Sequence, residues 1–296
     1  GTTIDLTPKK YSARSRVYEY GGLPYTVHGD DLYFVNFKDQ RIYWQNLKKI
    51  TEIRPITPKL NKDSSVGKYM DLTVSPNGKW LTFVYEKEVK DKENLNYIAT
   101  INLERKKITR PKILAKGADF YKQPLYSHDG KKIAWLQWDH PYMPWYSTKL
   151  YLGEFLNGKI KSAKRINLED KTTIKSFAFN NANTLFFSMD FPNQDNESFK
   201  NYYNIYKFQN NKIFPVTKTL SELSEIKFIN NSIISVENKK GEITLKSIDS
   251  ITGKLSTINS SFSEYNFLTV DAENNLYSVA YGPKIAPKIV NITKNE

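Results

Sequence analysis

The chain has 296 residues, and its 44 Lys and Arg against 31 Asp and Glu give a formal net charge of +13. It has no cysteine and only three histidines, which excludes disulfides, cysteine-ligated metal centres and thiol catalysis. No apolar run approaches the roughly 18 residues of a membrane-spanning helix, and no signal peptide is visible, so we expect no membrane partner and a cytoplasmic location. Because the chain begins at Gly1 rather than Met, truncation is an alternative reason for the missing signal.

The positive charge is spread along the whole chain. Its densest runs, such as Lys48-Lys49, Lys131-Lys132 and Lys239-Lys240, are short and fall where we place turns or outer strands. Proteins that bind nucleic acid concentrate their basic residues in one stripe or arm. The distribution therefore predicts a solubilising surface, and we expect no nucleic-acid partner.

Six short turns recur along the chain, near residues 29, 78, 130, 182, 231 and 274, at spacings of 43 to 52 residues. Each lies between two alternating apolar runs, as residues 75–79 lie between 69–74 and 80–84. Asn-Gly and Asp-Gly provide the positive φ that tight hairpins need. Further strand-like runs follow, as 96–101 and 111–114 follow the second turn. Four short strands in every repeat are typical of a β-propeller.

We therefore predict an all-β fold, with one β-propeller domain over residues 1–296 and about six four-stranded blades. Residues 3–8 resemble an outer, fourth strand, and the last repeat stops after its third strand, residues 288–292. Two alternatives follow from these ends. The first segment completes the last blade and closes a six-bladed ring, or it belongs to an absent upstream blade of a truncated seven-bladed propeller.

Three stretches are more specific than the blade pattern: R-V-Y-E-Y-G-G at residues 16–22, N-F-K-D-Q-R at 36–41 and W-D-H-P-Y-M-P-W at 138–145. Together they resemble the N-terminal propeller of prolyl-oligopeptidase-family serine peptidases, in the acylaminoacyl-peptidase and dipeptidyl-aminopeptidase-like branch. The close match covers roughly residues 14–155, and beyond it only the blade pattern continues. We expect Asp39, Gln40 and Arg41 to hold a blade hairpin together.

The resemblance implies a propeller that is followed by an α/β-hydrolase domain with catalytic Ser, Asp and His. This chain stops before such a domain and contains no G-x-S-x-G nucleophile motif, so no catalytic residue is assigned to it. The implied function is non-catalytic: the propeller admits and selects short peptides for the hydrolase domain of the same parent chain. The parent protein is then a serine peptidase, whereas enzymatic activity of this chain itself stays open.

In a propeller, the loops that enter the innermost strands share one face with the loops between second and third strands. The sharpest motifs fall in these loops, so we predict that they face the hydrolase domain or the peptide substrate. The candidate residues are Glu19, Tyr20, Gly21, Gly22, Asp119, Tyr121, Trp138, Asp139, His140 and Trp145.

Each candidate has a structural alternative. Glu19 pairs with the free amino group of a substrate, or it accepts backbone N–H groups of the Gly21-Gly22 turn. His140 is expected to fix its loop rather than act as a base, because no nucleophile motif accompanies it. Trp138 and Trp145 stack on peptide side chains, or they pack the loop onto its own blade.

Two other functional classes remain. A stand-alone propeller scaffold for protein–protein interaction would need no hydrolase domain. A propeller hydrolase with an axial Ca²⁺ would need several oxygen ligands, and Glu19, Asp119 and Asp271 are too few and too scattered for that. We therefore expect no metal and no cofactor, and the sequence does not indicate an oligomeric state.

Overall fold

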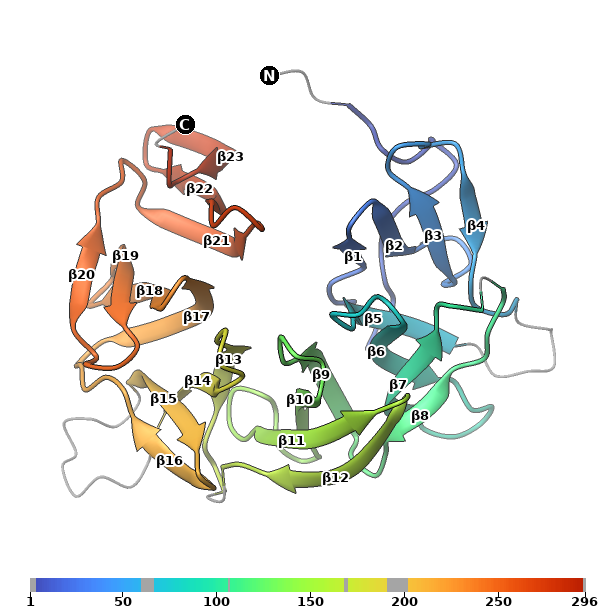
Figure 1. The fold of residues 1–296 in the computed structure, drawn as a ribbon, viewed down its shortest axis with the longest axis horizontal. Helices are drawn as coiled ribbons and strands as arrows, with labels where there is room; N and C mark the ends of the chain where they lie inside the picture. The colour runs from blue at the N-terminus through green and yellow to red at the C-terminus, as the bar shows by residue number, and fades with distance from the viewer. Residues whose placement is uncertain (1–3, 60–66, 106, 168–169, 191–201, 295–296) are drawn as a thin grey trace. The chain divides into compact units, whose positions relative to one another are not determined.

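All regular elements of the described residues are β-strands. The computed structural model describes residues 4–59, 67–105, 107–167, 170–190 and 202–294. Their strands form six antiparallel sheets that follow one another along the chain (Figure 1), five of them with four strands and the last with three. In this part of the chain no helix is long and apolar enough to cross a membrane.

The first three sheets contain β1 (Tyr25–His28), β2 (Asp31–Val35), β3 (Ile42–Asn46) and β4 (Ile53–Pro55); β5 (Gly67–Val74), β6 (Trp80–Lys87), β7 (Leu95–Asn102) and β8 (Lys112–Ala115); and β9 (Phe120–Tyr126), β10 (Lys132–Trp138), β11 (Lys149–Leu156) and β12 (Lys159–Arg165). The last three contain β13 (Ile174–Phe179), β14 (Leu185–Asp190), β15 (Tyr203–Gln209) and β16 (Lys212–Pro215); β17 (Glu222–Ile229), β18 (Ser232–Lys239), β19 (Glu242–Asp249) and β20 (Leu255–Ile258); and β21 (Glu264–Val270), β22 (Leu276–Gly282) and β23 (Ile285–Asn291).

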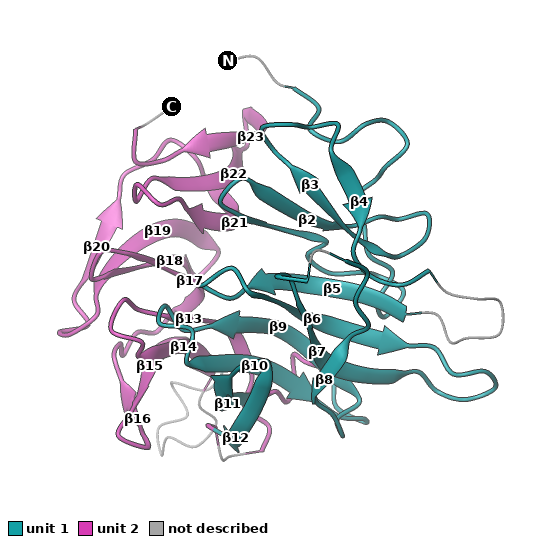
Figure 2. Ribbon diagram, turned by 45° about the vertical axis from the view of Figure 1, so that its right-hand side comes forward, with its two compact units in different colours: residues 1–143, 150–165 teal, residues 144–149, 166–296 magenta. Residues whose placement is uncertain are grey.

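These residues form two compact units, shown in different colours in Figure 2. Unit 1 comprises residues 1–143 and 150–165 and holds the first three sheets, whereas unit 2 comprises residues 144–149 and 166–296 and holds the last three. In unit 1 the innermost strand β5 contacts both β1 and β9, and in unit 2 β17 contacts both β13 and β21. Consecutive meanders with adjacent innermost strands are blades of a β-propeller, as predicted.

Apolar side chains fill the space between neighbouring blades. In unit 1 one cluster joins Tyr33 and Ile42 of the first blade to Leu81 and Phe83 of the second. Middle strands such as β2 and β6 are buried almost throughout, whereas the outer strand β12 is largely exposed. A middle strand packs on both faces, so its sequence is nearly continuous in apolar residues.

A short hairpin turn joins the first and second strands of each of the six blades. Each contains a glycine or asparagine with positive φ, the conformation that these two residues tolerate best. These residues are Gly29, Gly78, Gly130, Asn183, Asn230 and Asn274.

The two ends of the chain differ in outcome. The last blade has three strands in the described residues, as its sequence predicted. The strand predicted for residues 3–8 is wrong for residues 4–8, which form no strand, and Thr3 lies outside the described residues. The apolar pattern around Leu6 is not sufficient to form a strand. The Leu6 carbonyl accepts its hydrogen bond from the side-chain amide of Gln45 in β3, and not from the backbone of that strand.

Four innermost strands contain a β-bulge with a non-glycine residue at positive φ, namely Asp71, Gln123, Glu225 and Phe267. A bulge bends its strand and releases backbone groups from the sheet ladder. Side chains near these bulges bond the released groups of a neighbouring blade. In unit 2, Glu225 accepts the N–H of Leu268 at 2.8 Å and Ser176 accepts that of Ile226 at 2.9 Å.

Asp71 makes the corresponding connection in unit 1. Its buried carboxylate accepts the N–H of Leu23, which precedes β1, at 3.0 Å through Oδ1, and that of Gln123 in β9 at 2.8 Å through Oδ2. Burial raises the pKa of this carboxyl, and the two N–H donors act in the opposite direction. One side chain therefore joins three consecutive blades.

We expect the substitution Asp71→Asn to lower the free energy of unfolding by about 1–3 kcal/mol, because an amide has one acceptor atom and its NH₂ would face a buried N–H. Chemical denaturation followed by circular dichroism measures this change.

A matched control is Asp129→Asn. Asp129 accepts the Ser127 hydroxyl and the Lys131 N–H in the third blade's turn, as Asn77 accepts the Ser75 hydroxyl and the Lys79 N–H in the second. The amide of Asn77 already accepts the same two hydrogen bonds in the second blade. Asp129→Asn should therefore change the free energy of unfolding by less than about 0.5 kcal/mol. Equal losses in the two variants would contradict the role given to Asp71.

Candidate functional site

The segment 16–22 forms a tight turn before β1. The N–H groups of Glu19 and Gly21 donate to the carbonyls of Arg16 and Val17, and Val17 is fully buried. Tyr18 and Glu19 both have positive φ, at 54° and 67°. Two consecutive non-glycine residues in this conformation are unusual and need support from their surroundings.

The two glycines at residues 21 and 22 lie close to neighbouring atoms that leave little room for a Cβ. Gly21 has a φ of +82°, and a Cβ there would lie 2.7 Å from the carbonyl oxygen of Ser15. A Cβ on Gly22 would lie 2.5 Å from Met70 Sδ and 2.9 Å from Asp71 Oδ1. The turn therefore rests on β5 at the residue that joins the blades.

Tyr18 anchors the turn to the third blade. Its hydroxyl accepts the N–H of Tyr121 at 2.9 Å and donates to the Tyr121 carbonyl at 3.1 Å. Its ring packs edge-on against Phe120, which stacks on Trp138 with centroids 5.4 Å apart. The backbone N–H of Tyr18 donates to Glu86 Oε2 at 2.9 Å. These contacts fix the position of Tyr18. The side chain of the next residue, Glu19, is exposed to solvent.

Lys68 binds three carboxylates beside this turn. Its Nζ lies 3.0 Å from Glu19 Oε1, 2.8 Å from Glu86 Oε1 and 2.9 Å from Glu88 Oε1. The side chains of Lys68 and Glu86 are 6% and 3% exposed, whereas those of Glu19 and Glu88 are 85% and 38% exposed. Burial lowers the pKa of Lys68, but its bonds to the three carboxylates outweigh burial and raise the pKa above its ordinary value.

The W-D-H stretch closes onto the loop that enters the third blade. Asp139 Oδ1 accepts the N–H of Asp119 at 3.0 Å, and Asp119 Oδ2 accepts the N–H of His140 at 2.8 Å. The His140 ring packs edge-on against Phe120. Both aspartates thus bond backbone groups and hold two loops together.

The N-F-K-D-Q-R stretch supports the same turn from the first blade. Asp39 accepts the side-chain amide of Asn36, and the guanidinium of Arg41 donates to the carbonyl of Thr57. Gln40 Oε1 accepts the N–H of Arg16 at 2.8 Å. These residues hold a blade hairpin together, as expected, and connect it to residue 16.

The predicted candidates thus divide into a buried and an exposed set. Tyr121 and Trp138 are buried, and they contribute to the packing of the loops. Burial raises the pKa of Tyr121 to about 12, and its hydroxyl accepts the N–H of Ala118. Trp145, in unit 2, is 72% exposed. For the exposed candidates, contact with a partner stays a prediction.

Four residues of this region were not predicted from the sequence, namely Lys68, Asp71, Glu86 and Glu88, and Tyr18 was noted only as part of the motif at residues 16–22. One sequence signal could have identified them: a charged residue inside an otherwise apolar strand. Lys68 and Asp71 interrupt the apolar run of β5, and Lys68 faces Glu86 across the β5–β6 ladder. We define the entry-loop site as residues 16–22, Lys68, Glu86, Glu88, 118–121 and 138–140.

The entry-loop site is rich in carboxylates, and His140 is its only histidine. In the residues that the structure describes, no group of three or more His, Asp and Glu is placed to hold a metal ion. The arrangement suits a different ligand, because exposed carboxylates that share one ammonium can bind a second one.

Solved structures with a similar fold include several peptidases and also an oligogalacturonate lyase, which has 12% identity, a TM-score of 0.64 and coverage of 98% of this chain and 78% of that one. A Mycobacterium tuberculosis puromycin-hydrolysing peptidase matches 99% of this chain and 47% of its own, with 21% identity and a TM-score of 0.84. A puromycin hydrolase matches 100% of this chain and 48% of its own, with 20% identity and a TM-score of 0.84. The chain shares the β-propeller fold of these peptidases.

A Pyrococcus horikoshii acylaminoacyl peptidase is a more distant neighbour, with 13% identity, a TM-score of 0.63 and coverage of 88% of this chain and 41% of that one. No model of a known protein family matches the sequence, and no curated protein matches it. The chain spans about half the length of the peptidases that it resembles. The predicted resemblance is therefore confirmed at the level of the fold.

We expect Lys68→Met to lower the free energy of unfolding by about 3 kcal/mol, because it leaves the Glu86 carboxylate buried without its cation. The double variant Lys68→Met/Glu86→Gln should recover part of this loss, since the Gln oxygen can still accept the Tyr18 N–H. Because the pKa of Lys68 is raised, its contribution is complete below the ordinary lysine value of about 10.4 and fades only at higher pH. Chemical denaturation at neutral pH measures the free energy of unfolding of the parent protein and of the two variants.

The control is Lys79→Met, which removes the exposed pair of Lys79 with Glu104 and should leave stability nearly unchanged. If Lys68→Met were as stable as this control, Lys68 would not hold the site together.

Proposed function

We propose that this propeller is the non-catalytic domain of a serine peptidase, and that it selects short substrates with a free α-amino group for a hydrolase domain outside this chain. The fold likeness to puromycin-hydrolysing and acylaminoacyl peptidases supports the first part. The chemistry of the entry-loop site supports the second part.

The observation that carries the proposal is the unequal charge around Lys68. One ammonium faces three carboxylates, so the group has a formal charge of −2 when all four are ionised. Glu86 is buried and already accepts the Tyr18 N–H, but Glu19 and Glu88 are open to solvent. The ammonium of a substrate would neutralise part of this excess and form charge-assisted hydrogen bonds.

Glu19 is the residue best placed for this role. The alternative expected from the sequence was that the Glu19 carboxylate accepts backbone N–H groups of the Gly21-Gly22 turn. In the structure the Glu19 carboxylate pairs with Lys68 instead, and the Gly21 N–H donates to the carbonyl of Val17. Lys68 holds Glu19 from one side and leaves most of its carboxylate exposed. The support of Tyr18 sets the position of Glu19 before any substrate arrives, which reduces the entropy lost on binding.

Tyr20 offers an apolar surface next to this carboxylate. Its exposed ring lies 5.9 Å from that of Tyr18. An aromatic first side chain of a substrate could pack against Tyr20 while its amino group binds Glu19. Puromycin combines a free amino group with an aromatic side chain, so it is a suitable first substrate to test.

We expect Glu19→Gln to raise KM about tenfold for substrates with a free α-amino group, with a small effect on kcat, because one charge-assisted bond is lost before the chemical step. The measurement uses the native protein, including its hydrolase domain, and compares one fluorogenic aminoacyl amide with its N-acetylated form. KM for the acetylated form should not change.

Glu104→Gln is the matched control, because Glu104 is another exposed glutamate paired with one lysine, Lys79. It should leave KM unchanged for both substrates. If Glu19→Gln changed KM equally for the free and the acetylated substrate, the role of Glu19 in binding the amino group would be excluded.

A further inference from the structure

Two exposed arginines stack on one phenyl ring in the first blade. The guanidinium carbon of Arg14 lies 5.0 Å from the centroid of the Phe37 ring, and that of Arg16 lies 4.2 Å from it. Because both distances end at the same centroid, the two guanidinium carbons are at most about 9 Å apart. We call Arg14, Arg16 and Phe37 the arginine clamp. It presents two positive charges to solvent at one place.

The chain that carries the two arginines is extended. The N–H of Arg14 donates to the carbonyl of Val35 at 3.0 Å, which places this segment alongside the end of β2. Ser15 and Val17 are buried and alternate with the two exposed arginines. Residues two positions apart on an extended chain project to the same side. Both arginines therefore point away from the core.

One buried side chain fixes the backbone of all three members of the clamp. Gln40 is 5% exposed. Its Oε1 accepts the N–H of Arg16 at 2.8 Å, and its Nε2 donates to the carbonyls of Phe37 at 3.0 Å and of Arg14 at 3.4 Å. The stacking on Phe37 holds the side chains as well. A site that is ordered before binding loses less conformational entropy when a ligand arrives.

Neither guanidinium of the clamp has an acidic partner among the residues that the structure describes. No ion pair and no side-chain hydrogen bond joins Arg14 or Arg16 to any of them. Asp39 lies in the same loop as Phe37, but its Oδ1 accepts the side-chain amide of Asn36 at 2.9 Å and its Oδ2 accepts the hydroxyl of Tyr43 at 2.8 Å. The donors of both guanidinium groups are therefore open to a ligand.

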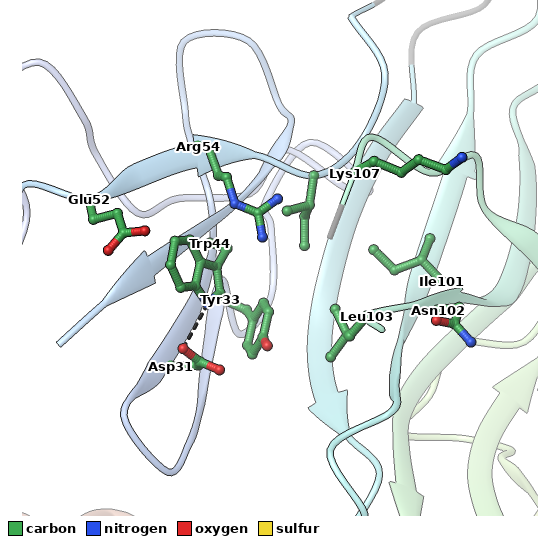
Figure 3. Close-up of a pocket in the computed structure, with 10 residues that line it drawn as sticks. Asp31, Tyr33, Trp44, Glu52, Arg54, Ile101, Asn102, Leu103 and Lys107 are labelled. Carbon is green, nitrogen blue, oxygen red and sulfur yellow. Dashed lines mark hydrogen bonds between the residues drawn. The ribbon is translucent and has the colours of Figure 1, made fainter. Parts of the chain in front are cut away.

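Another stacked arginine of the first blade has acidic residues close by. Arg54 lies over the Trp44 ring, 4.7 Å from its centroid, in a pocket that the side chains of Asp31 and Glu52 also line (Figure 3). The clamp instead brings two cations onto one ring without such groups. Like charges held close together repel each other, so an anionic ligand would relieve this repulsion.

The spacing of the two cations indicates the form of that anion. An arginine pairs with a planar carboxylate through two parallel hydrogen bonds. In an extended peptide, side chains two residues apart lie on the same side and about 6.6 Å apart along the chain. This spacing is within the limit of about 9 Å between the guanidinium carbons. Two carboxylates at alternate positions of an extended peptide can therefore meet one arginine each.

From these contacts we infer that the arginine clamp binds an extended acidic peptide segment of a partner, with Asp or Glu at two alternate positions. Arg14 and Arg16 each pair with one carboxylate, and the adjacent exposed Lys38 adds a third positive charge. Arg16 belongs to the entry-loop site, but the Glu19 carboxylate pairs with Lys68 in β5 and takes no part in the clamp. The inference can therefore fail while the proposed selection of substrates stands, and the reverse also holds.

The test measures binding of blocked peptides to the purified native protein by saturation-transfer NMR at low ionic strength. Acetyl-TETET-amide carries two glutamates at alternate positions, and acetyl-TQTQT-amide is its uncharged counterpart. Acetyl-TEETT-amide has the same charge on adjacent residues, which project to opposite sides of an extended chain. We expect saturable binding of the first peptide, at least about tenfold tighter than that of the other two, and weaker binding as salt is added.

Equal binding of the first two peptides would overturn the inference, because the carboxylates would then contribute nothing. Equal binding of the two acidic peptides would also overturn it, since net charge rather than spacing would decide. So would the absence of saturable binding of acetyl-TETET-amide below about 10 mM.

Two double variants assign the binding to the clamp. Arg14→Gln/Arg16→Gln removes both charges and should weaken binding of acetyl-TETET-amide at least about tenfold. The matched control Arg105→Gln/Arg110→Gln removes two exposed arginines between β7 and β8, so it lowers the net charge equally and should bind the peptide as the parent does. Unchanged binding in the folded clamp variant, or an equal loss in the control, would overturn the inference.

Discussion

The carboxylate of Asp71 is the interaction on which both the packing of unit 1 and the position of the entry-loop site depend. It accepts one N–H from the segment before β1 and one from β9, so the entry to the first blade and the innermost strands β5 and β9 meet at one buried side chain. Gly22 lies against the same carboxylate so closely that no Cβ fits. The turn that presents Glu19 is therefore built directly on the connection between the blades. A buried charge needs full hydrogen bonding, and here that requirement positions a surface loop.

The entry-loop site combines a rigid base with an incompletely neutralised charge. Aromatic packing of Tyr18, Phe120 and Trp138, and backbone bonds of Asp119 and Asp139, hold the loops. Most of the conspicuous motif residues serve this support. Of the three carboxylates around Lys68, those of Glu19 and Glu88 are accessible to solvent, and the nearby ring of Tyr20 is exposed. Support of the loops and exposure to solvent are thus divided between different side chains of the same short motifs.

The sequence predicted the blades because their signals are local. Positive φ at Gly78 or Asn230 is encoded within a few residues, and so is the alternation of the flanking strands. The candidate site depends instead on pairs distant in the chain: Glu19 and Lys68 are 49 residues apart, and Asp71 bonds residues 48 and 52 positions away. The bulge at Asp71 also breaks the two-residue period, so a buried carboxylate falls inside an apolar run. Local patterns predict neither feature.

The size and reactivity of the native product in the source cell test most directly whether this propeller is part of a serine peptidase. An antibody to this chain, used with a serine-directed fluorophosphonate probe, reports both in one blot. We predict one band of about twice 34.4 kDa that carries the probe, because the similar peptidases are about twice as long as this chain. An unlabelled band near 34.4 kDa would contradict it and favour a stand-alone propeller scaffold.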